Sequence, residues 1–235
     1  KSVQHLEQFQ GGEILVTEAT LMPGRGRHRP PWRPYARRPR SRGYSVVAYD
    51  TRGHGDSDWD PAGRYDVERL ATDLLAVRDH FSANTPPAVV GASLGGMTAL
   101  GAHLLASGAS WAAVILVDVT PRLEFEGARR VVTFMAAHPD GFATLGDAAE
   151  VIAAYNPHRA RPENLDGLHK VLRQRPDGRW VWRWDPAFVH SNFDFLRDGA
   201  AAGTEQFDAI SHLLIDGARR VTAPTLLVRG LLSDV

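Results

Sequence analysis

Short apolar runs alternate with amphipathic stretches along most of the chain. The runs 44–49, 88–92 and 113–117 are apolar at consecutive positions, which is typical of strands buried on both faces. The stretch 66–81 has the helical period instead, with an N-cap candidate followed by apolar residues at intervals of three and four: Asp66, Val67, Leu70, Leu74, Val77 and Phe81. A second helix is predicted for 94–106. This alternation predicts a mostly parallel, doubly wound sheet with helices on both faces, which is the α/β class.

One further strand is predicted at 225–229, directly after Pro224. The preceding residues 120–220 have helical patterns and many alanines, and we expect them to form a helical cap inserted into the sheet domain. Within them, 179–184 alternates Trp with Arg or Val, which predicts a short extended segment. We expect the tryptophans of this segment to pack in the interior of the cap. The alternative is that they line an apolar substrate pocket.

The composition narrows the function classes. With 27 basic and 27 acidic residues, 23% charged and 43% hydrophobic positions, the 235 residues fit neither a disordered chain nor a uniformly basic nucleic-acid binder. The lack of cysteine excludes a disulfide framework, a thiolate nucleophile and cysteine-ligated metal sites. No apolar run approaches the roughly 18 residues of a membrane span, and no leader-like stretch follows Lys1. We therefore expect no membrane partner and take the cytoplasm as the default location.

Residues 23–42 differ from their surroundings. They contain eight arginines and five prolines without an acidic residue, which leaves 19 basic against 27 acidic residues elsewhere. The prolines forbid a continuous helix or a central strand, so we predict a loop. A local disturbance of the reading frame is the favoured hypothesis for this composition. The alternative is a genuine basic arm that binds nucleic acid or acidic partners.

The sextet Gly91-Ala92-Ser93-Leu94-Gly95-Gly96 lies between an apolar run and a predicted helix. This is the context of the G-x-S-x-G nucleophile elbow, in which a tight, strained turn exposes the serine hydroxyl. The glycines are needed because a side chain at Gly91 or Gly95 would collide with neighbouring backbone. The helix that follows directs its first amides at a reacting carbonyl oxygen. We therefore predict Ser93 as the nucleophile and the Leu94 amide as an oxyanion donor.

With this elbow, the sequence resembles the α/β-hydrolase superfamily from about residue 43 onward. Three motifs carry the resemblance in the expected order: the Asp-Thr-Arg-Gly-His-Gly-Asp-Ser loop at 50–57, the Ser93 elbow, and the strand and turn at 224–234. The resemblance is greatest to cap-bearing, cofactor-free hydrolases of the esterase, carbon–carbon hydrolase and haloperoxidase-like branch, so it implies neither a cofactor nor a metal. Serine at the elbow disfavours epoxide hydrolase and haloalkane dehalogenase activity, because those enzymes have aspartate there.

The resemblance also implies a catalytic acid. Asp234 matches the acid of a Ser-His-Asp triad, in the turn that follows the predicted strand 225–229. Its role would be to hold a histidine in the tautomer that accepts the serine proton. Asp118, at the end of the run 113–117, is the alternative acid, because some relatives have their carboxylate at that place.

The family's histidine comes after the acid, one strand further along, but none of the ten histidines follows Asp234. We therefore expect this chain to be truncated before its base, with the last strand and helix of the fold missing. His54 is expected to be a structural loop residue, and His80 and His103 are expected on helix surfaces. A base from the cap is disfavoured by its order along the chain, which applies to His138, His158, His169, His190 and His212.

The amino-terminal side departs from the family's pattern. Counting back from Tyr44, Pro23-Gly24 takes the place of the family's His-Gly motif, and Trp32 takes that of a common tryptophan. By this alignment, the resemblance assigns the second oxyanion donor to the Arg25 amide.

Together these features predict a serine hydrolase that cleaves an ester or related acyl bond of a small apolar substrate through an acyl-enzyme on Ser93, nearly inactive as this chain. The predicted domains are the N-terminal core 1–119, the helical cap 120–220 and the start of the C-terminal core 221–235. Esterase, carbon–carbon hydrolase and perhydrolase activity stay open, as does the oligomeric state. Two other classes are an inactive hydrolase-fold binding or interaction protein and a nucleic-acid binder that uses the basic arm, the latter disfavoured.

Overall fold

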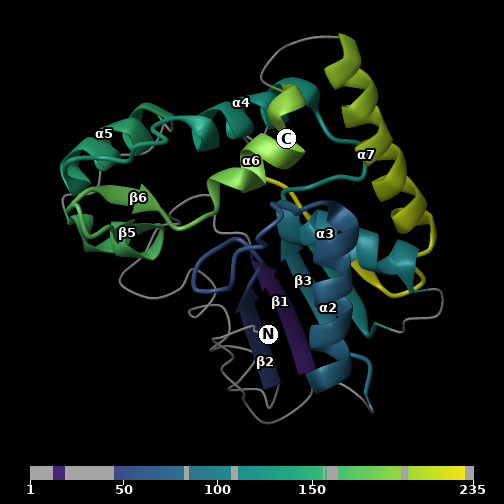
Figure 1. Cartoon of the computed structure of the whole chain (residues 1–235). Helices are drawn as coiled ribbons and strands as arrows, with labels where there is room; N and C mark the ends of the chain where they lie inside the picture. Colours follow the sequence, from purple (N-terminus) through teal and green to yellow (C-terminus); the bar gives the residue numbers. More distant parts are fainter. Residues whose placement is uncertain are drawn as a thin grey trace.

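The structure is a computed structural model of the chain, shown in Figure 1. It describes residues 13–18, 45–81, 85–106, 111–155, 157, 164–196 and 201–230. The basic segment 23–42 and the predicted site residues Arg25 and Asp234 lie outside the described residues.

In the described part of the chain, five parallel strands form the central sheet, in the order β2-β1-β3-β4-β7. Their bounds are β1 Glu13–Glu18, β2 Ser45–Asp50, β3 Ala88–Ala92, β4 Ala113–Val117 and β7 Thr225–Val228. The four strands predicted from apolar runs are all present, and the α/β class is confirmed. Strand β1 was not among the predicted strands, although its Ile-Leu-Val-Thr centre has the composition of a strand. All carboxyl ends lie at the same edge of the sheet because every pair is parallel.

Two helices predicted from periodicity cover the sheet: α2 at Val67–Phe81 and α3 at Leu94–Leu105. Asp66 accepts a hydrogen bond from the Arg69 amide (3.0 Å) and so caps the start of α2, as its side-chain chemistry predicts. The apolar stripe of α2 is buried, whereas α3 is buried on nearly every side. Helix α3 lies between the sheet, α2 and the 19-residue helix α7 (Ala201–Arg219). None of the described helices is long and apolar enough to cross a bilayer.

The burial of α3 corrects one prediction. His103 does not lie on the helix surface, because its side chain is buried and its ring lies against Trp111, with centroids 5.9 Å apart. Its imidazole is 5% exposed, and its Nδ1 lies 2.8 Å from the Ala99 carbonyl oxygen. Burial lowers the pKa of His103. His80, by contrast, is exposed near the end of α2, as predicted.

Between the neighbouring strands β4 and β7, the chain makes a long excursion over the carboxyl edge of the sheet, which we call the insertion (residues 118–224; Figure 1). Its elements before α7 are α4 Phe125–Ala136, α5 Leu145–Tyr155, η1 Leu165–Lys170, β5 Leu172–Gln174, β6 Trp180–Trp182, α6 Pro186–Asn192 and η2 Asp194–Leu196. The predicted extended segment is confirmed as β6, which pairs antiparallel with β5.

The tryptophans of this segment pack inside the insertion. The rings of Trp182 and Trp184 are stacked with centroids 4.5 Å apart, and both side chains are buried. Trp182 also contacts Phe134 of α4 and the ring of Phe142. The interior position favoured by the sequence is thus confirmed for these two rings.

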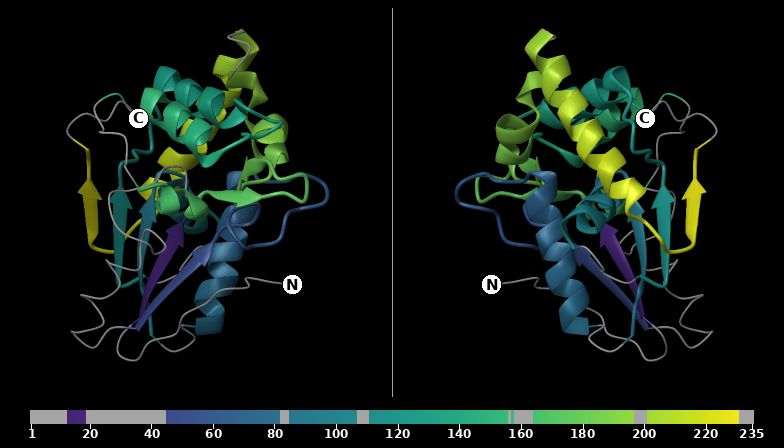
Figure 2. Two further views of the ribbon diagram at one scale, coloured as in Figure 1. Left: turned by 90° about the vertical axis from the view of Figure 1, so that its left-hand side faces the viewer. Right: turned by 90° about the vertical axis from the view of Figure 1, so that its right-hand side faces the viewer.

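Among the described strands, β7 lies at an edge of the sheet (Figure 2). Its apolar residues Leu226, Leu227 and Val228 are 57%, 51% and 42% exposed, whereas strands of parallel sheets are usually covered on both faces. An exposed apolar edge with unpaired backbone groups is a template for pairing with another chain.

We therefore expect the chain to elute from size-exclusion chromatography as a dimer or larger species. The substitution Leu227→Lys should shift it to the monomer volume, because a charged edge disfavours strand pairing. Leu105→Lys, at an exposed leucine on α3, is the matched control and should leave the elution unchanged. A monomer peak for the unsubstituted chain would contradict this expectation.

The contact between α3 and α7 gives a stability prediction. A Cβ on Gly217 would lie 2.2 Å from the Leu100 carbonyl oxygen, so Gly217→Ala forces the two helices apart. We expect a loss of about 1–3 kcal/mol in the free energy of unfolding, measured by urea denaturation. Gly167→Ala is the control, since a Cβ there meets nothing within 4 Å. Equal effects of the two substitutions would show that α7 does not pack as described.

Candidate active site

Ser93 occupies the sharp turn between β3 and α3. Its φ of 47° and ψ of −115° form a backbone conformation that residues other than glycine rarely adopt. Three hydrogen bonds hold this conformation: the Ser93 amide donates to the Val117 carbonyl (3.0 Å), and the Ser93 carbonyl accepts from the amides of Gly96 (2.9 Å) and Met97 (3.0 Å). The strain that the sequence motif predicts at this serine is therefore present in the backbone.

The positions of Gly91 and Gly96 beside Ser93 have no room for a side chain. A Cβ on Gly91 would lie 2.3 Å from the Gly95 carbonyl oxygen, and a Cβ on Gly96 would lie 2.3 Å from Cγ1 of Val119. The turn brings the end of β3 this close to the first turn of α3. Leu94 is the first residue of α3, so its amide belongs to the N-terminal N–H groups that have no intrahelical partner. Such an amide is available to a carbonyl oxygen bound beside Ser93.

A cavity of about 100 Å³ opens beside Ser93, between the elbow and the insertion. Its walls come from α3, the end of β4, α4, α6, η2 and α7, and they are mostly apolar. Buried members of the wall are Met97, Val132, Met135, Phe188, Leu196 and Phe207. Among the described lining residues, the ones that carry charge are Asp118 and Glu124. The site thus combines one hydroxyl nucleophile candidate with an apolar chamber.

Asp118, the alternative acid, lies in this cavity with Ser93. It follows β4 directly and has φ 54°, and its amide donates to the Val228 carbonyl (2.7 Å). Its Oδ1 accepts a hydrogen bond from the Gly230 amide (3.1 Å). Asp118 therefore connects the ends of β4 and β7 beside the cavity. Asp234, the acid that the sequence favours, lies outside the described residues, and the choice between the two stays a prediction.

The described histidines do not line the cavity of Ser93. They are His54, His80, His103, His138, His169, His190 and His212. Groups of three or more residues able to hold a metal ion are also absent from the described part of the chain. Within these residues, the structure brings together Ser93, Leu94 and Asp118 and places no base beside them.

His54 is buried at the junction between the sheet domain and the insertion. Its side chain is 2% exposed, its Nδ1 lies 3.2 Å from the Arg52 carbonyl oxygen, and its Nε2 has no hydrogen-bond partner among the described residues. Burial lowers the pKa of His54 to about 4, although the Arg52 carbonyl and Asp185 oppose this shift. The prediction of a loop residue is correct, but its contact with residues far along the chain could not be read from the sequence.

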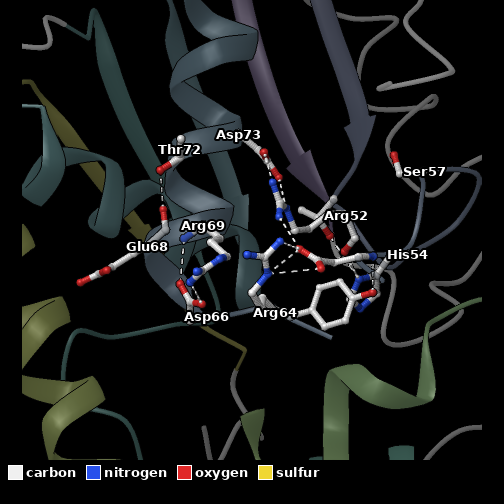
Figure 3. A network of polar contacts seen from close by, with 12 residues as sticks. Arg52, His54, Ser57, Arg64, Asp66, Glu68, Arg69, Thr72 and Asp73 are labelled. Carbon is white, nitrogen blue, oxygen red and sulfur yellow. Dashed lines mark hydrogen bonds and ion pairs between the residues drawn. The ribbon is translucent and has the colours of Figure 1, made fainter. Parts of the chain in front are cut away.

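The loop that carries His54 is fixed to α2 by ion pairs (Figure 3). Arg52 binds both carboxylate oxygens of Asp73 on α2, at 2.5 and 2.6 Å, and its Nη1 lies 3.2 Å from Asp60. The hydrogen bond to Asp73 raises the pKa of Arg52 against the effect of burial. Arg64 pairs with Asp60 at 3.2 Å. Because bidentate arginine–carboxylate pairs have a defined geometry, this network orients the loop relative to the core.

Comparisons with known proteins agree with this geometry. A family model described as "Alpha/beta hydrolase family" matches residues 21–233. The chain is 30% identical over 193 residues to the esterase Rv0045c of Mycobacterium tuberculosis, covering 80% of this chain and 58% of the esterase. It is 46% identical over 56 residues to 3-oxoadipate enol-lactonase 2 of Acinetobacter baylyi, covering 23% of this chain and 20% of the lactonase. The matched part therefore spans less than two thirds of either relative.

Solved structures have the same fold. The structure of the M. tuberculosis esterase Rv0045c matches with a TM-score of 0.57 and 23% identity, over 97% of this chain and 85% of that one. A putative hydrolase from Rickettsia typhi matches with a TM-score of 0.65 and 12% identity, over 95% and 82% of the two chains. The chain belongs to the alpha/beta hydrolase family, and the resemblance found in its motifs is confirmed.

The low pKa of His54 predicts how stability depends on pH. An unfolded histidine binds its proton near pH 6.5, whereas folded His54 does so near pH 4, so the unfolded state binds more protons between these values. The free energy of unfolding should fall by roughly 3 kcal/mol as pH decreases from about 6.5 to about 4. Urea denaturation at several pH values measures this slope.

The matched variants are His54→Gln, which should lose that part of the slope, and His80→Gln, which should keep it because His80 is exposed. Equal slopes in the unsubstituted chain and in His54→Gln would contradict the assignment.

Proposed function

We propose that this protein is a serine hydrolase that cleaves an ester or a related acyl bond through an acyl-enzyme on Ser93. The observation that carries the proposal is the position of Ser93: a strained turn presents its hydroxyl at the start of α3, inside an apolar cavity. The likeness to an esterase and the family membership support hydrolysis as the reaction class.

In this proposal Ser93 Oγ attacks the acyl carbon, and the carbonyl electron pair moves onto the oxygen beside the Leu94 amide. The Arg25 amide is the second proposed oxyanion donor. The serine proton passes to a histidine and then to the leaving alcohol, when the carbon–oxygen bond of the ester breaks. A water molecule next attacks the acyl-enzyme and loses a proton to the same base. The bond between the acyl carbon and Ser93 Oγ then breaks, the base returns the proton to Oγ, and the acid is released. Ser93 is then regenerated, so atoms and charges balance over one turnover.

The acid that orients the histidine is proposed to be Asp234, with Asp118 as the second candidate. Asp118 is supported by its place in the same cavity as Ser93. The described histidines stay outside that cavity. This supports the proposal that residues 1–235 alone turn over very slowly. Loss of a triad histidine lowers turnover about 10⁶-fold in a well-studied serine protease.

The substrate is proposed to be a small molecule with an apolar acyl group. The cavity wall beyond Ser93 consists mostly of aliphatic and aromatic side chains, which gain by burying apolar surface. Residues 120–220 are proposed to act as the cap of this site, over a core formed by 1–119 and 221–235. The position of the insertion over the carboxyl edge of the sheet supports this division.

Intact-mass measurement after treatment with a fluorophosphonate tests the nucleophile. The probe adds covalently to an activated serine, so we expect one adduct that disappears in Ser93→Ala. Ser211→Ala, at a buried serine on α7, is the control and should keep the adduct. The same measurement on a version extended along its reading frame shows whether further residues accelerate labelling.

Faster labelling of the extended version would support a base outside residues 1–235. Rapid labelling of residues 1–235 alone would place the base within them and contradict the proposed low activity. An adduct that survives Ser93→Ala, or no adduct in either version, would overturn the nucleophile assignment.

A further inference from the structure

The loop after β2 is joined to the insertion by a short antiparallel bridge. The Gly55 amide donates to the Arg183 carbonyl (2.8 Å), and the Asp185 amide donates to the Gly53 carbonyl (2.7 Å). His54 and Trp184 face each other between these two bonds. Gly53 has φ +73°, and a Cβ there would lie 2.5 Å from the Tyr65 ring, so the bridge requires glycine at this position.

A buried side-chain hydrogen bond lies directly beside this bridge. The Tyr65 hydroxyl donates to Oδ2 of Asp185 and accepts from the Asp60 amide (2.8 Å). Tyr65 is fully buried and Asp185 is 7% exposed, although they are 120 residues apart in the sequence. Burial, and then the bond to Asp185, raises the pKa of Tyr65, so its hydroxyl stays protonated and donates at neutral pH.

Asp185 also starts the helix that forms part of the cavity wall. Its Oδ1 accepts from the Ala187 amide (2.9 Å) and caps α6. One residue further, Phe188 projects into the wall of the Ser93 cavity. Its ring packs edge-on against His54, with centroids 4.7 Å apart, and against Tyr65 at 5.8 Å. Asp185 thus binds Tyr65 of the sheet domain through Oδ2 and caps α6, the helix that carries Phe188, through Oδ1.

We infer that Tyr65, Asp185 and His54 are positioning residues that fix Phe188 and thereby set the acyl-chain selectivity of the Ser93 cavity. We call this set of contacts the clasp. The reference to an acyl chain rests on the proposed function. None of the three residues lines the cavity, so the clasp acts on the bound group only through Phe188.

The size of the cavity makes its selectivity sensitive to this ring. An engineered cavity of about 150 Å³ holds one benzene molecule, so about 100 Å³ accommodates roughly four carbon atoms. A small displacement of Phe188 therefore changes a large share of the available volume. With the clasp intact, we expect the site to prefer a butyryl group over much longer chains.

Binding of intact esters to the Ser93→Ala protein tests the clasp without requiring any reaction. The probes are ethyl acetate, butyrate, hexanoate and octanoate, and saturation-transfer NMR gives their dissociation constants. We expect the tightest binding at butyrate for Ser93→Ala alone. Adding Tyr65→Phe should weaken butyrate binding by about five- to tenfold and reduce the difference between butyrate and octanoate, since a buried carboxylate oxygen and an amide lose their partner.

Tyr49→Phe is the matched control, because Tyr49 is also buried but its hydroxyl has no hydrogen-bond partner in the described part of the chain. It should leave the chain-length profile unchanged. Asp185→Asn retains an oxygen that accepts from either Tyr65 or Ala187 but not from both, so its profile should lie between the others. If Tyr65→Phe does not fold, Asp185→Asn decides the question alone.

A butyrate preference that persists in Tyr65→Phe and Asp185→Asn, with only a lower melting temperature, would overturn the clasp as a selectivity device. Failure of every ester to bind Ser93→Ala would overturn it as well. Ester binding with a clasp-dependent profile, but no fluorophosphonate adduct on Ser93, would support the clasp and count against the proposed nucleophile alone.

Discussion

The close approach of Gly91 to Gly95 is the contact on which the site and much of the core depend. It allows β3 to turn directly into α3 with Ser93 in a strained conformation, where a larger residue at position 91 would push strand and helix apart. Because β3 is the middle strand of the sheet, the turn also places α3 over the centre of the molecule. Helices α2 and α7 then pack on both sides of α3. Backbone strain at the serine is therefore maintained by the most buried part of the fold.

A second layer of contacts places the insertion over this turn. Arg52 and Asp73 fix the loop after β2 to α2, and the bridge at Gly53 and Gly55 joins that loop to the insertion. The cavity beside Ser93 lies between the elbow and the insertion. Three aromatic side chains of the insertion belong to its wall: Phe188, Phe193 and Phe207. The chemistry at the serine and the shape of the chamber thus depend on different sets of residues.

Local patterns in the sequence were sufficient for most of the core. Apolar runs predicted four strands, and the period of three and four residues with Asp66 predicted α2, because these signals are fixed by residues close along the chain. Strand β1 was missed beside the atypical basic segment. His103 was placed wrongly, because α3 is packed on nearly every side by other elements, and its own sequence does not show this. The bond between Tyr65 and Asp185 has no local signal at all, and Arg25 and Asp234 stay predictions outside the described residues.

The position of α3 also bears on how the chain is synthesised. This helix is apolar on nearly all sides, yet α7, which covers one of them, begins about a hundred residues later. At ribosomal rates of roughly 5–20 residues per second, α3 waits about 5–20 s for that partner to emerge. Contacts between such distant segments also form slowly after synthesis, because the intervening loop must close. During this interval the nascent chain exposes an apolar helix surface, so we expect its yield to depend on chaperones.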